Sequence, residues 1–203
     1  MKKIICLTGL DGCGKSTQAE LLCRWLEDKG VLYKHIRMQD IDVPSKIILK
    51  KSLMYIRKNN IIAQSDIMET IMIAFRTAYI FQHIIMPCLN NGTLVLLERY
   101  IESDKLYMTK KKMELYHYNQ IIKSYIEPAI CNIYIKVPVD ICFSRVLQRG
   151  NISEHENLND LKFAESFFDD NREKFQLKSI DGTKQPDFVF NKIREIVETC
   201  IEF

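Results

Sequence analysis

The sequence predicts an α/β fold, a three-layer sandwich in which helices flank a parallel sheet of about five strands. Two observations lead to this prediction. Short apolar runs alternate along the chain with longer segments of helical periodicity, and a glycine-rich loop at residues 9–16 separates the first run from the first helical segment. Strands that alternate with helices pair in parallel through right-handed crossovers, so we expect helices on both faces of the sheet.

Composition limits the class of protein. The chain of 203 residues fits one domain, residues 1–203, and its 47% hydrophobic and 27% charged residues are ordinary for a globular protein. A net charge of +3 with scattered basic residues argues against binding to duplex nucleic acid. Seven cysteines without a CxxC pair predict free thiols and a cytoplasmic protein, and the first apolar run is too short for a signal peptide.

The first third of the chain contains two expected strands. Residues 3–8 are almost entirely apolar and end at Gly9, which is typical of a buried strand. Residues 15–29 place apolar side chains on one side of a helix, and Gly30 ends that segment. Residues 31–38 are expected to form the second strand.

Two helices are expected next, at residues 45–58 and 65–90. Pro87 should kink or shorten the second of them, because proline lacks the amide donor and its ring clashes with the preceding turn. Its stretch 71–89 is rich in apolar residues, as a membrane span would be. Arg76, Gln82 and His83 interrupt this stretch, so we expect a buried helix and no membrane.

The rest of the chain continues the alternation. Further strands are expected at residues 93–97, 129–137 and 179–181, and helices up to about residue 125, at 139–148, at 159–177 and from about Pro186. Ligands of parallel sheets bind beyond the carboxyl ends of the strands. The segments that follow the strands should therefore converge on one edge; they are residues 9–16, 37–40, 98–103 and 181–186.

The glycine-rich loop carries the strongest functional signal. Its sequence, GLDGCGKS, fits the pattern GxxxxGK[ST] of the P-loop NTPases, and it lies between a strand and a helix as that motif requires. Backbone amides of such a loop point at phosphate oxygens, Lys15 can reach the β- and γ-phosphates, and Ser16 can hold Mg²⁺. We therefore expect ATP and Mg²⁺, with ATP bound by Gly9, Gly12, Cys13, Gly14, Lys15, Ser16 and Thr17.

A second polar cluster follows the apolar run at residues 94–97. Glu98 can contact Mg²⁺ in the manner of a Walker-B carboxylate, so the expected metal ligands are Ser16 and Glu98. Arg99 can bridge the phosphates of donor and acceptor, a task that suits its planar, permanently charged guanidinium. The expected catalytic residues are Lys15, Arg99, Asp11 and Glu98.

Three segments together resemble the thymidylate kinase family. They are KIICLTGLDG at the start, LERYIES in the middle and IDGTKQP near the end, and they resemble the family's GxDGxGKST loop, its DRY followed by serine and its late IDATQP-like strand end. The resemblance covers most of the chain. It implies ATP-dependent phosphorylation of a nucleoside monophosphate, with dTMP as the expected acceptor, a homodimer, and a short lid at about residues 149–158.

The resemblance also implies roles for individual residues. Asp11 would approach the acceptor, Arg37 would grip its phosphate and Arg99 would bridge the two phosphates. Phe75 and Arg76 match the family's base-stacking and base-contacting pair. The remaining matches are Tyr100, Ser103 and Tyr107 in the acceptor pocket, and Arg145 and Arg149 beside the donor nucleotide.

The chain departs from the family at several of these positions. Glu98 replaces an aspartate, Met108 stands where a glutamine is common, and MQDID after Arg37 lacks the usual Glu-Pro. In the family, a glycine at the position of Gly12 normally accompanies an arginine in the lid. Residues 150–157 contain no arginine, and His155 stands at about that place.

Two other functions remain open from the sequence. The segment ERYIESD also resembles deoxynucleoside kinases, and Asp40 could be the carboxylate base that such an enzyme needs to take a proton from a sugar hydroxyl. The lid without arginine leaves open a nucleotide-binding regulatory protein with degenerate catalysis. Assays with thymidine and dTMP side by side separate these alternatives from the monophosphate kinase.

Overall fold

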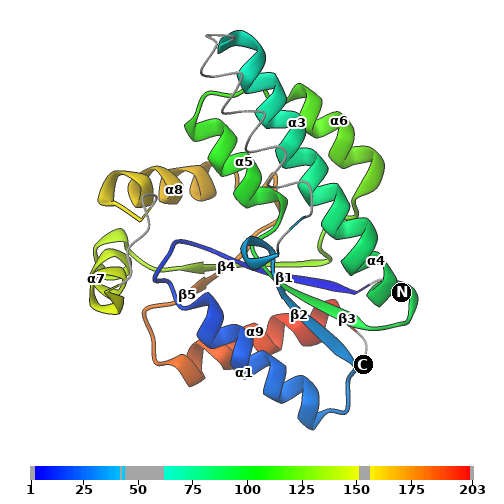
Figure 1. The fold of residues 1–203 in the computed structure, drawn as a ribbon. Coiled ribbons are helices and arrows are strands. Elements are labelled where there is room, and N and C mark those ends of the chain that lie inside the picture. Colours follow the sequence, from blue (N-terminus) through cyan, green and yellow to red (C-terminus); the bar gives the residue numbers. More distant parts are fainter. Residues whose placement is uncertain (1–2, 42, 44–61, 151–155, 202–203) are drawn as a thin grey trace.

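The computed structural model of the chain describes residues 3–41, 43, 62–150 and 156–201 (Figure 1). Its centre is a parallel five-stranded sheet in the order β2-β3-β1-β4-β5, and the predicted α/β class is thereby confirmed. The strands are β1 (Ile4–Thr8), β2 (Tyr33–Arg37), β3 (Leu94–Glu98), β4 (Cys131–Lys136) and β5 (Lys178–Asp181).

Helices cover both faces of this sheet. In Figure 1, α1 and α9 lie below the sheet, whereas α3, α5 and α6 rise above it. The α-helices are α1 (Lys15–Asp28), α3 (Ile62–Ile80), α4 (Met86–Asn90), α5 (Ile101–Lys110), α6 (Tyr116–Tyr125), α7 (Val139–Arg149), α8 (Leu158–Asp170) and α9 (Pro186–Cys200), with a 3₁₀ turn η1 (Met38–Asp40) and a π-helical segment η2 (Phe81–Ile85).

Burial on both faces explains the uniformly apolar strands. Every residue of β1 and β3 is buried. Ile5 and Leu7 join the core beneath α1 and α9, while Ile4 and Cys6 join the core beneath η2 and α4. A strand that is covered on both faces has a continuously apolar sequence, whereas a strand covered on one face alternates apolar and polar residues. β1 lies in the middle of the sheet, so the loop that follows it opens at the centre of the carboxyl edge.

The long helix after the second strand is interrupted near Pro87, as predicted, but in a form that was not expected. The α-helix α3 ends at Ile80, the π-helical segment η2 precedes the proline, and the chain continues helical as α4. The wider π turn ends two residues before Pro87, where an α-helix would have needed the missing amide donor. The helix expected at residues 45–58 lies outside the described residues.

A second difference concerns α8, which ends at Asp170 and not near residue 177. Asn171 follows it, and its side-chain amide donates to the carbonyl oxygen of Phe167 at 2.9 Å. An asparagine that binds the backbone of the preceding turn competes with helix propagation. The chain then turns, with Gln176 at φ 51°, before β5 begins.

The stretch Asp66–Asn90 is long and apolar enough to cross a membrane by length and composition alone. Its carboxyl-terminal part packs against the sheet, where Ile80, Phe81 and Ile85 are fully buried with residues of β1 and β3. This part of the stretch therefore serves as a core helix of the sandwich, in line with the predicted buried helix.

Candidate active site

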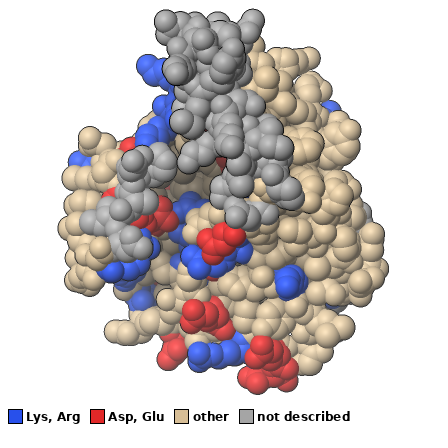
Figure 2. Space-filling view, in the orientation of Figure 1, with Lys and Arg blue, Asp and Glu red and all other residues tan. Residues whose placement is uncertain are grey.

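A cavity of about 1130 Å³ opens at the carboxyl edge of the sheet. It is lined by the loop after β1, by the ends of β2 and β3, by the segment after β5 and by arginines of α7, so the predicted convergence of these segments is confirmed. Figure 2 shows Lys, Arg, Asp and Glu side chains gathered around the hollow in this face. The volume is sufficient for more than one small ligand.

Glycines shape the loop after β1. A Cβ atom on Gly9 would lie 2.7 Å from the carbonyl oxygen of Ile135, and one on Gly12 would lie 2.4 Å from that of Cys142. Neither position has room for a side chain. Gly14, at φ 98°, forms the N-cap of α1, so the amino end of that helix points into the loop. Unpaired amides at a helix amino terminus attract anions, and the loop is therefore suited to bind phosphate.

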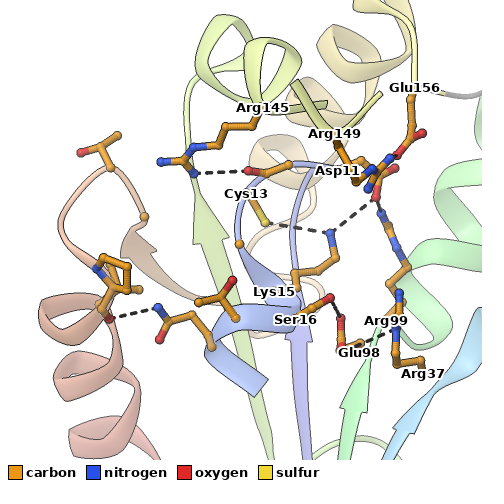
Figure 3. A pocket seen from close by; sticks show the side chains of 18 of the residues that line it. Asp11, Cys13, Lys15, Ser16, Arg37, Glu98, Arg99, Arg145, Arg149 and Glu156 are labelled. Atoms are coloured by element: carbon orange, nitrogen blue, oxygen red, sulfur yellow. Dashed lines mark hydrogen bonds and ion pairs between the residues drawn. The ribbon is translucent and has the colours of Figure 1, made fainter. Parts of the chain in front are cut away.

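Lys15 lies inside this loop with 7% of its surface exposed (Figure 3). Its Nζ donates to the carbonyl oxygens of Leu10 at 2.7 Å and Gly9 at 3.2 Å, and lies 3.6 Å from a carboxylate oxygen of Asp11. These acceptors hold the ammonium group at the inner rim of the loop. Phosphate oxygens that enter the loop can replace them as partners of Lys15.

Glu98 occupies the end of β3 and is almost fully buried. Its Oε2 accepts a hydrogen bond from the Ser16 hydroxyl at 2.7 Å, whereas its Oε1 lies 3.0 Å from His35 Nε2 and 3.7 Å from Arg37 Nε. Burial raises the pKa of Glu98, but the hydrogen bonds from His35 and Ser16 outweigh it and hold the pKa below its ordinary value. Glu98 is therefore an ionised carboxylate at neutral pH.

The pair formed by Ser16 and Glu98 has the chemistry of a magnesium site. A hydroxyl and a carboxylate oxygen are hard ligands, and Mg²⁺ commonly takes only one or two protein ligands and completes its shell with water and phosphate. Among the described residues no cluster of three or more His, Cys, Asp or Glu side chains forms an all-protein metal cage. The two residues thus fit a cation that is shared with a nucleotide.

Arg99 follows Glu98 and turns back over the loop. Its φ of 67° is left-handed, which is rare for a residue with a side chain, and its amide donates to the carbonyl oxygen of Leu7 at 3.0 Å. This backbone turn brings the guanidinium into an ion pair with Asp11. Burial raises the pKa of Asp11, but the charges of Arg99 and Lys15 outweigh it, so the pKa of this carboxyl is lowered.

Three further arginines line the cavity. Arg37 forms an ion pair with Asp40 at 3.2 Å and is 45% exposed, so its guanidinium is accessible from the cavity. On α7, Arg145 donates to the carbonyl oxygen of Gly12 at 3.2 Å, and Arg149 forms an ion pair with Glu156. Figure 3 shows these two arginines on the α7 side of the loop, opposite Arg37. His155 lies outside the described residues.

Five residues expected in the acceptor pocket are not among the described residues that line the cavity; they are Phe75, Arg76, Tyr100, Ser103 and Tyr107. Phe75 is 51% exposed, with its ring 6.5 Å from that of Tyr79. Arg76 instead donates to the carbonyl oxygen of Met38.

Two tyrosines of this set make contacts elsewhere. Tyr100 is 2% exposed and its hydroxyl donates to the carbonyl oxygen of Glu127 at 2.7 Å. The Tyr107 hydroxyl donates to Glu69 at 2.7 Å. Met108, at the position expected near the base, is fully buried in the core between α3, α5 and α6. These side chains join α5 to its neighbours.

Sequence reasoning missed His35 and Glu156, which contact Glu98 and Arg149. His35 has no local motif, and its partner Glu98 is 63 residues away along the chain. A usable signal was nevertheless present. His35 and Arg37 stand two apart on one strand, so their side chains share a face, and Arg37 was already expected at the site.

Comparison with known proteins gives a consistent result. A family model described as "Thymidylate kinase" matches residues 7–193. The chain is 31% identical over 177 residues to a "Probable thymidylate kinase" of Pyrococcus abyssi, covering 80% of this chain and 83% of that protein. It is 28% identical over 205 residues to a "Thymidylate kinase" of Thermosipho africanus, and 27% identical over 210 residues to a "Probable thymidylate kinase" of Thermococcus kodakarensis. The Thermosipho match covers 98% of both chains, and the Thermococcus match covers 97% of this chain and 98% of that protein.

Proposed function

Since the chain belongs to the thymidylate kinase family of nucleoside monophosphate kinases, we propose that it transfers the γ-phosphoryl group of ATP to dTMP. The products would be dTDP and ADP, and Mg²⁺ would be required. The observation that carries this proposal is one cavity in which the phosphate loop faces Glu98, Arg99 and Arg37. Such a cavity offers a triphosphate and a monophosphate adjacent binding positions.

The donor phosphates would lie in the loop after β1. Backbone amides of residues 9–16 and the amino end of α1 would hold the β-phosphate, and Lys15 would exchange its carbonyl partners for β- and γ-phosphate oxygens. Arg145 and Arg149 would approach the donor from α7, since both already line this side of the cavity. Ser16 and Glu98 would hold Mg²⁺, which supplies charge neutralisation between the β- and γ-phosphates when bound.

The acceptor would enter from the side of β2 and β3. Arg37 would bind its phosphate, because its guanidinium is exposed and borders the cavity. Arg99 would lie between the two phosphates with Asp11 fixing its guanidinium. A phosphate oxygen of dTMP then attacks the γ-phosphorus, the bond to the bridging β–γ oxygen breaks, and ADP leaves. Catalysis rests on positioning and on stabilising the charge of the transferred group.

A monophosphate acceptor is itself an anion and needs no base. A nucleoside acceptor would need one, and Asp40 would be the candidate. Asp40 forms an ion pair at 3.2 Å with Arg37, the cation that would bind an acceptor phosphate. This pairing favours the monophosphate over the nucleoside.

The test is a phosphorylation assay with dTMP and thymidine side by side, in ATP and Mg²⁺. We expect turnover of dTMP and little of thymidine. Lys15→Ala should lower kcat/KM by about 1000-fold or more, because it removes the cation from the transferred phosphoryl group. Lys29→Ala, at the far end of α1, is the matched control. Turnover of thymidine alone, ATP binding without any turnover, or an active Lys15→Ala variant would contradict the proposal.

We also propose that the enzyme is a homodimer that pairs through α3. Ile67, Met68, Ile71 and Phe75 are each 38–51% exposed, and three of them recur every four residues, which forms one apolar stripe along the helix. A second copy would cover this stripe. Sedimentation should show a dimer in the wild type and a shift toward monomer in Ile71→Glu; a monomeric wild type at high concentration would contradict the assembly.

We also propose a cytoplasmic location. All seven cysteines are free thiols, which is the state that a reducing compartment maintains.

A further inference from the structure

We infer that His35 is a positioning residue that orients Glu98 toward the magnesium site. The inference rests on the proposed function, because it assigns His35 a role toward the cation that Ser16 and Glu98 would hold. His35 itself is not among the described residues that line the cavity. Its effect is transmitted through one carboxylate oxygen of Glu98.

The two oxygens of Glu98 have different partners. Oε2 accepts from the Ser16 hydroxyl at 2.7 Å and so faces the phosphate loop. Oε1 faces β2, where His35 Nε2 lies at 3.0 Å and Arg37 Nε at 3.7 Å. Contacts on Oε1 therefore decide how Oε2 is presented to the loop.

The register of the sheet produces this arrangement. β2 and β3 pair in parallel with Arg37 opposite Glu98 and His35 opposite Leu96. Residues two apart on a strand point to the same face, so His35 and Arg37 both reach the one carboxylate that ends β3. A glutamate is long enough to lean back along the strand toward His35.

The proton on the imidazole can be assigned from the chemistry of its partner. A carboxylate that binds a metal ion has only acceptors, so the imidazole nitrogen at 3.0 Å must carry the hydrogen. His35 Nε2 thus donates to Glu98 Oε1. A donor bonded to a carboxylate is a strong, directional contact that fixes the plane of the acid.

The other contact on Oε1 is less permanent. Arg37 is 45% exposed, divides its charge between Glu98 and Asp40, and would turn to the acceptor phosphate when dTMP binds. The side chain of His35 is 26% exposed and has Glu98 as its partner on β3. When Arg37 leaves, His35 is the contact that keeps Oε1 in place.

A glutamate needs this support more than an aspartate does. It has one more rotatable bond between backbone and carboxylate, and ordering it costs correspondingly more conformational entropy. A residue that hydrogen-bonds to a metal-binding carboxylate without touching the metal reduces this freedom before the metal binds. Loss of such a bond commonly lowers metal affinity or activity by about 10–100-fold. His35 supplies such a bond to Glu98.

The test compares two substitutions at the same position. His35→Leu keeps similar volume but has no donor, whereas His35→Gln keeps a nitrogen donor at about the same reach. ADP binding to each protein is measured by calorimetry in Mg²⁺ and again in EDTA. We expect His35→Leu to lose about 10-fold of the Mg²⁺-dependent gain in ADP affinity while its affinity in EDTA stays within about 2-fold of wild type. His35→Gln should retain most of the gain.

Kinetics provide a second readout. His35→Leu should lower kcat and raise the Mg²⁺ concentration needed for half-maximal rate, with the KM for dTMP within about 2-fold of wild type, because Arg37 is unchanged. Lys34→Ala, an exposed neighbour on β2, is the matched control for changes to the strand. Thermal unfolding of each variant verifies that it is folded.

The outcomes separate this inference from the proposed function. Full Mg²⁺ dependence in His35→Leu would overturn the role of His35 and leave the kinase assignment intact. Equal losses in His35→Gln and His35→Leu would also overturn it, since packing and not the donor would then matter. If wild-type protein binds ADP equally with Mg²⁺ and with EDTA, the metal assignment itself is wrong and the role of His35 is wrong with it.

Discussion

Two pairs of buried or half-buried acids lie in opposite electrostatic environments. Asp11 and Glu98 border the cavity and have lowered pKa values, whereas Glu102 and Asp104, on the first turn of α5, have raised ones. Burial raises the pKa of all four carboxyl groups. The difference lies in what surrounds each acid.

The cavity acids have cations, and the α5 acids have neutral donors. Asp11 pairs with Arg99, and Glu98 lies against His35 and Arg37. Glu102 accepts from the side-chain amide of Asn132, which also donates to a backbone carbonyl. Asp104 accepts from Thr77 at 2.6 Å and Tyr118 at 2.9 Å, and in the described part of the chain neither α5 acid forms an ion pair.

This contrast distinguishes a binding site from a structural junction. Arginines and lysine at the cavity can exchange their carboxylate partners for phosphate, so the charges there are held ready for a ligand. Within the described residues neither α5 acid holds a cation in an ion pair, and their hydrogen bonds join α5 to α3, α6 and β4. Three predictions test the distinction.

The largest effect is expected at Glu98. Glu98→Gln removes the charge that would bind Mg²⁺ while keeping the size of the side chain, and kcat/KM for dTMP should fall by about 100-fold or more. Steady-state kinetics at saturating Mg²⁺ measure this. Glu102→Gln, the same change four residues later, is the control and should keep near wild-type activity. Equal losses of kcat/KM in both variants would contradict the assignment of Glu98 to the active site and of Glu102 to a structural role.

A smaller effect is expected at Asp11. Asp11→Asn leaves Arg99 without its carboxylate partner, and kcat/KM should fall by about 10-fold because one charge-assisted contact is lost. Stability should change as well. The lowered pKa means that the Asp11 carboxylate stabilises the fold above the ordinary carboxyl pKa, and this contribution is lost as the pH falls through the lowered value. Chemical unfolding at several pH values should therefore show the two proteins converging in acid; a constant difference would contradict the assignment.

The smallest expected effect is a gain in stability, and it concerns Glu102. Its raised pKa means that the folded protein is most stable when this acid is protonated and loses stability as the pH rises from the ordinary carboxyl pKa through the raised value. Glu102→Gln cannot ionise, so at neutral pH it should be more stable than wild type by about 1 kcal/mol. Urea unfolding at pH 4 and pH 8 measures this, and a variant that is less stable at pH 8 would contradict the prediction.

The sequence allowed much of the fold to be predicted. The five strands, the loop at residues 9–16 and the convergence of the segments after the strands depend on local patterns that a single chain displays. What it could not show depends on contacts between distant segments. The run ERYIESD holds Glu98 and both α5 acids within seven residues, and spacing alone does not tell which carboxylate meets a cation.

Two features that the sequence did not indicate have the same cause. His35 was overlooked because strand order decides its neighbour, and β3 follows β2 in the sheet only after a long crossover. The continuation past Pro87 required a π turn that no pattern in the segment indicates.

The contact between Gly12 and α7 limits how the enzyme can change through evolution. A side chain at position 12 would collide with the backbone of Cys142, 2.4 Å from its first atom, so this loop cannot acquire an arginine without moving the helix behind it. In a lineage with this packing, any additional positive charge over the donor must come from outside the loop, and α7 already contributes Arg145 and Arg149 there. Selection would then act on α7 and the residues that follow it, and sequence variation there should track changes in turnover among descendants.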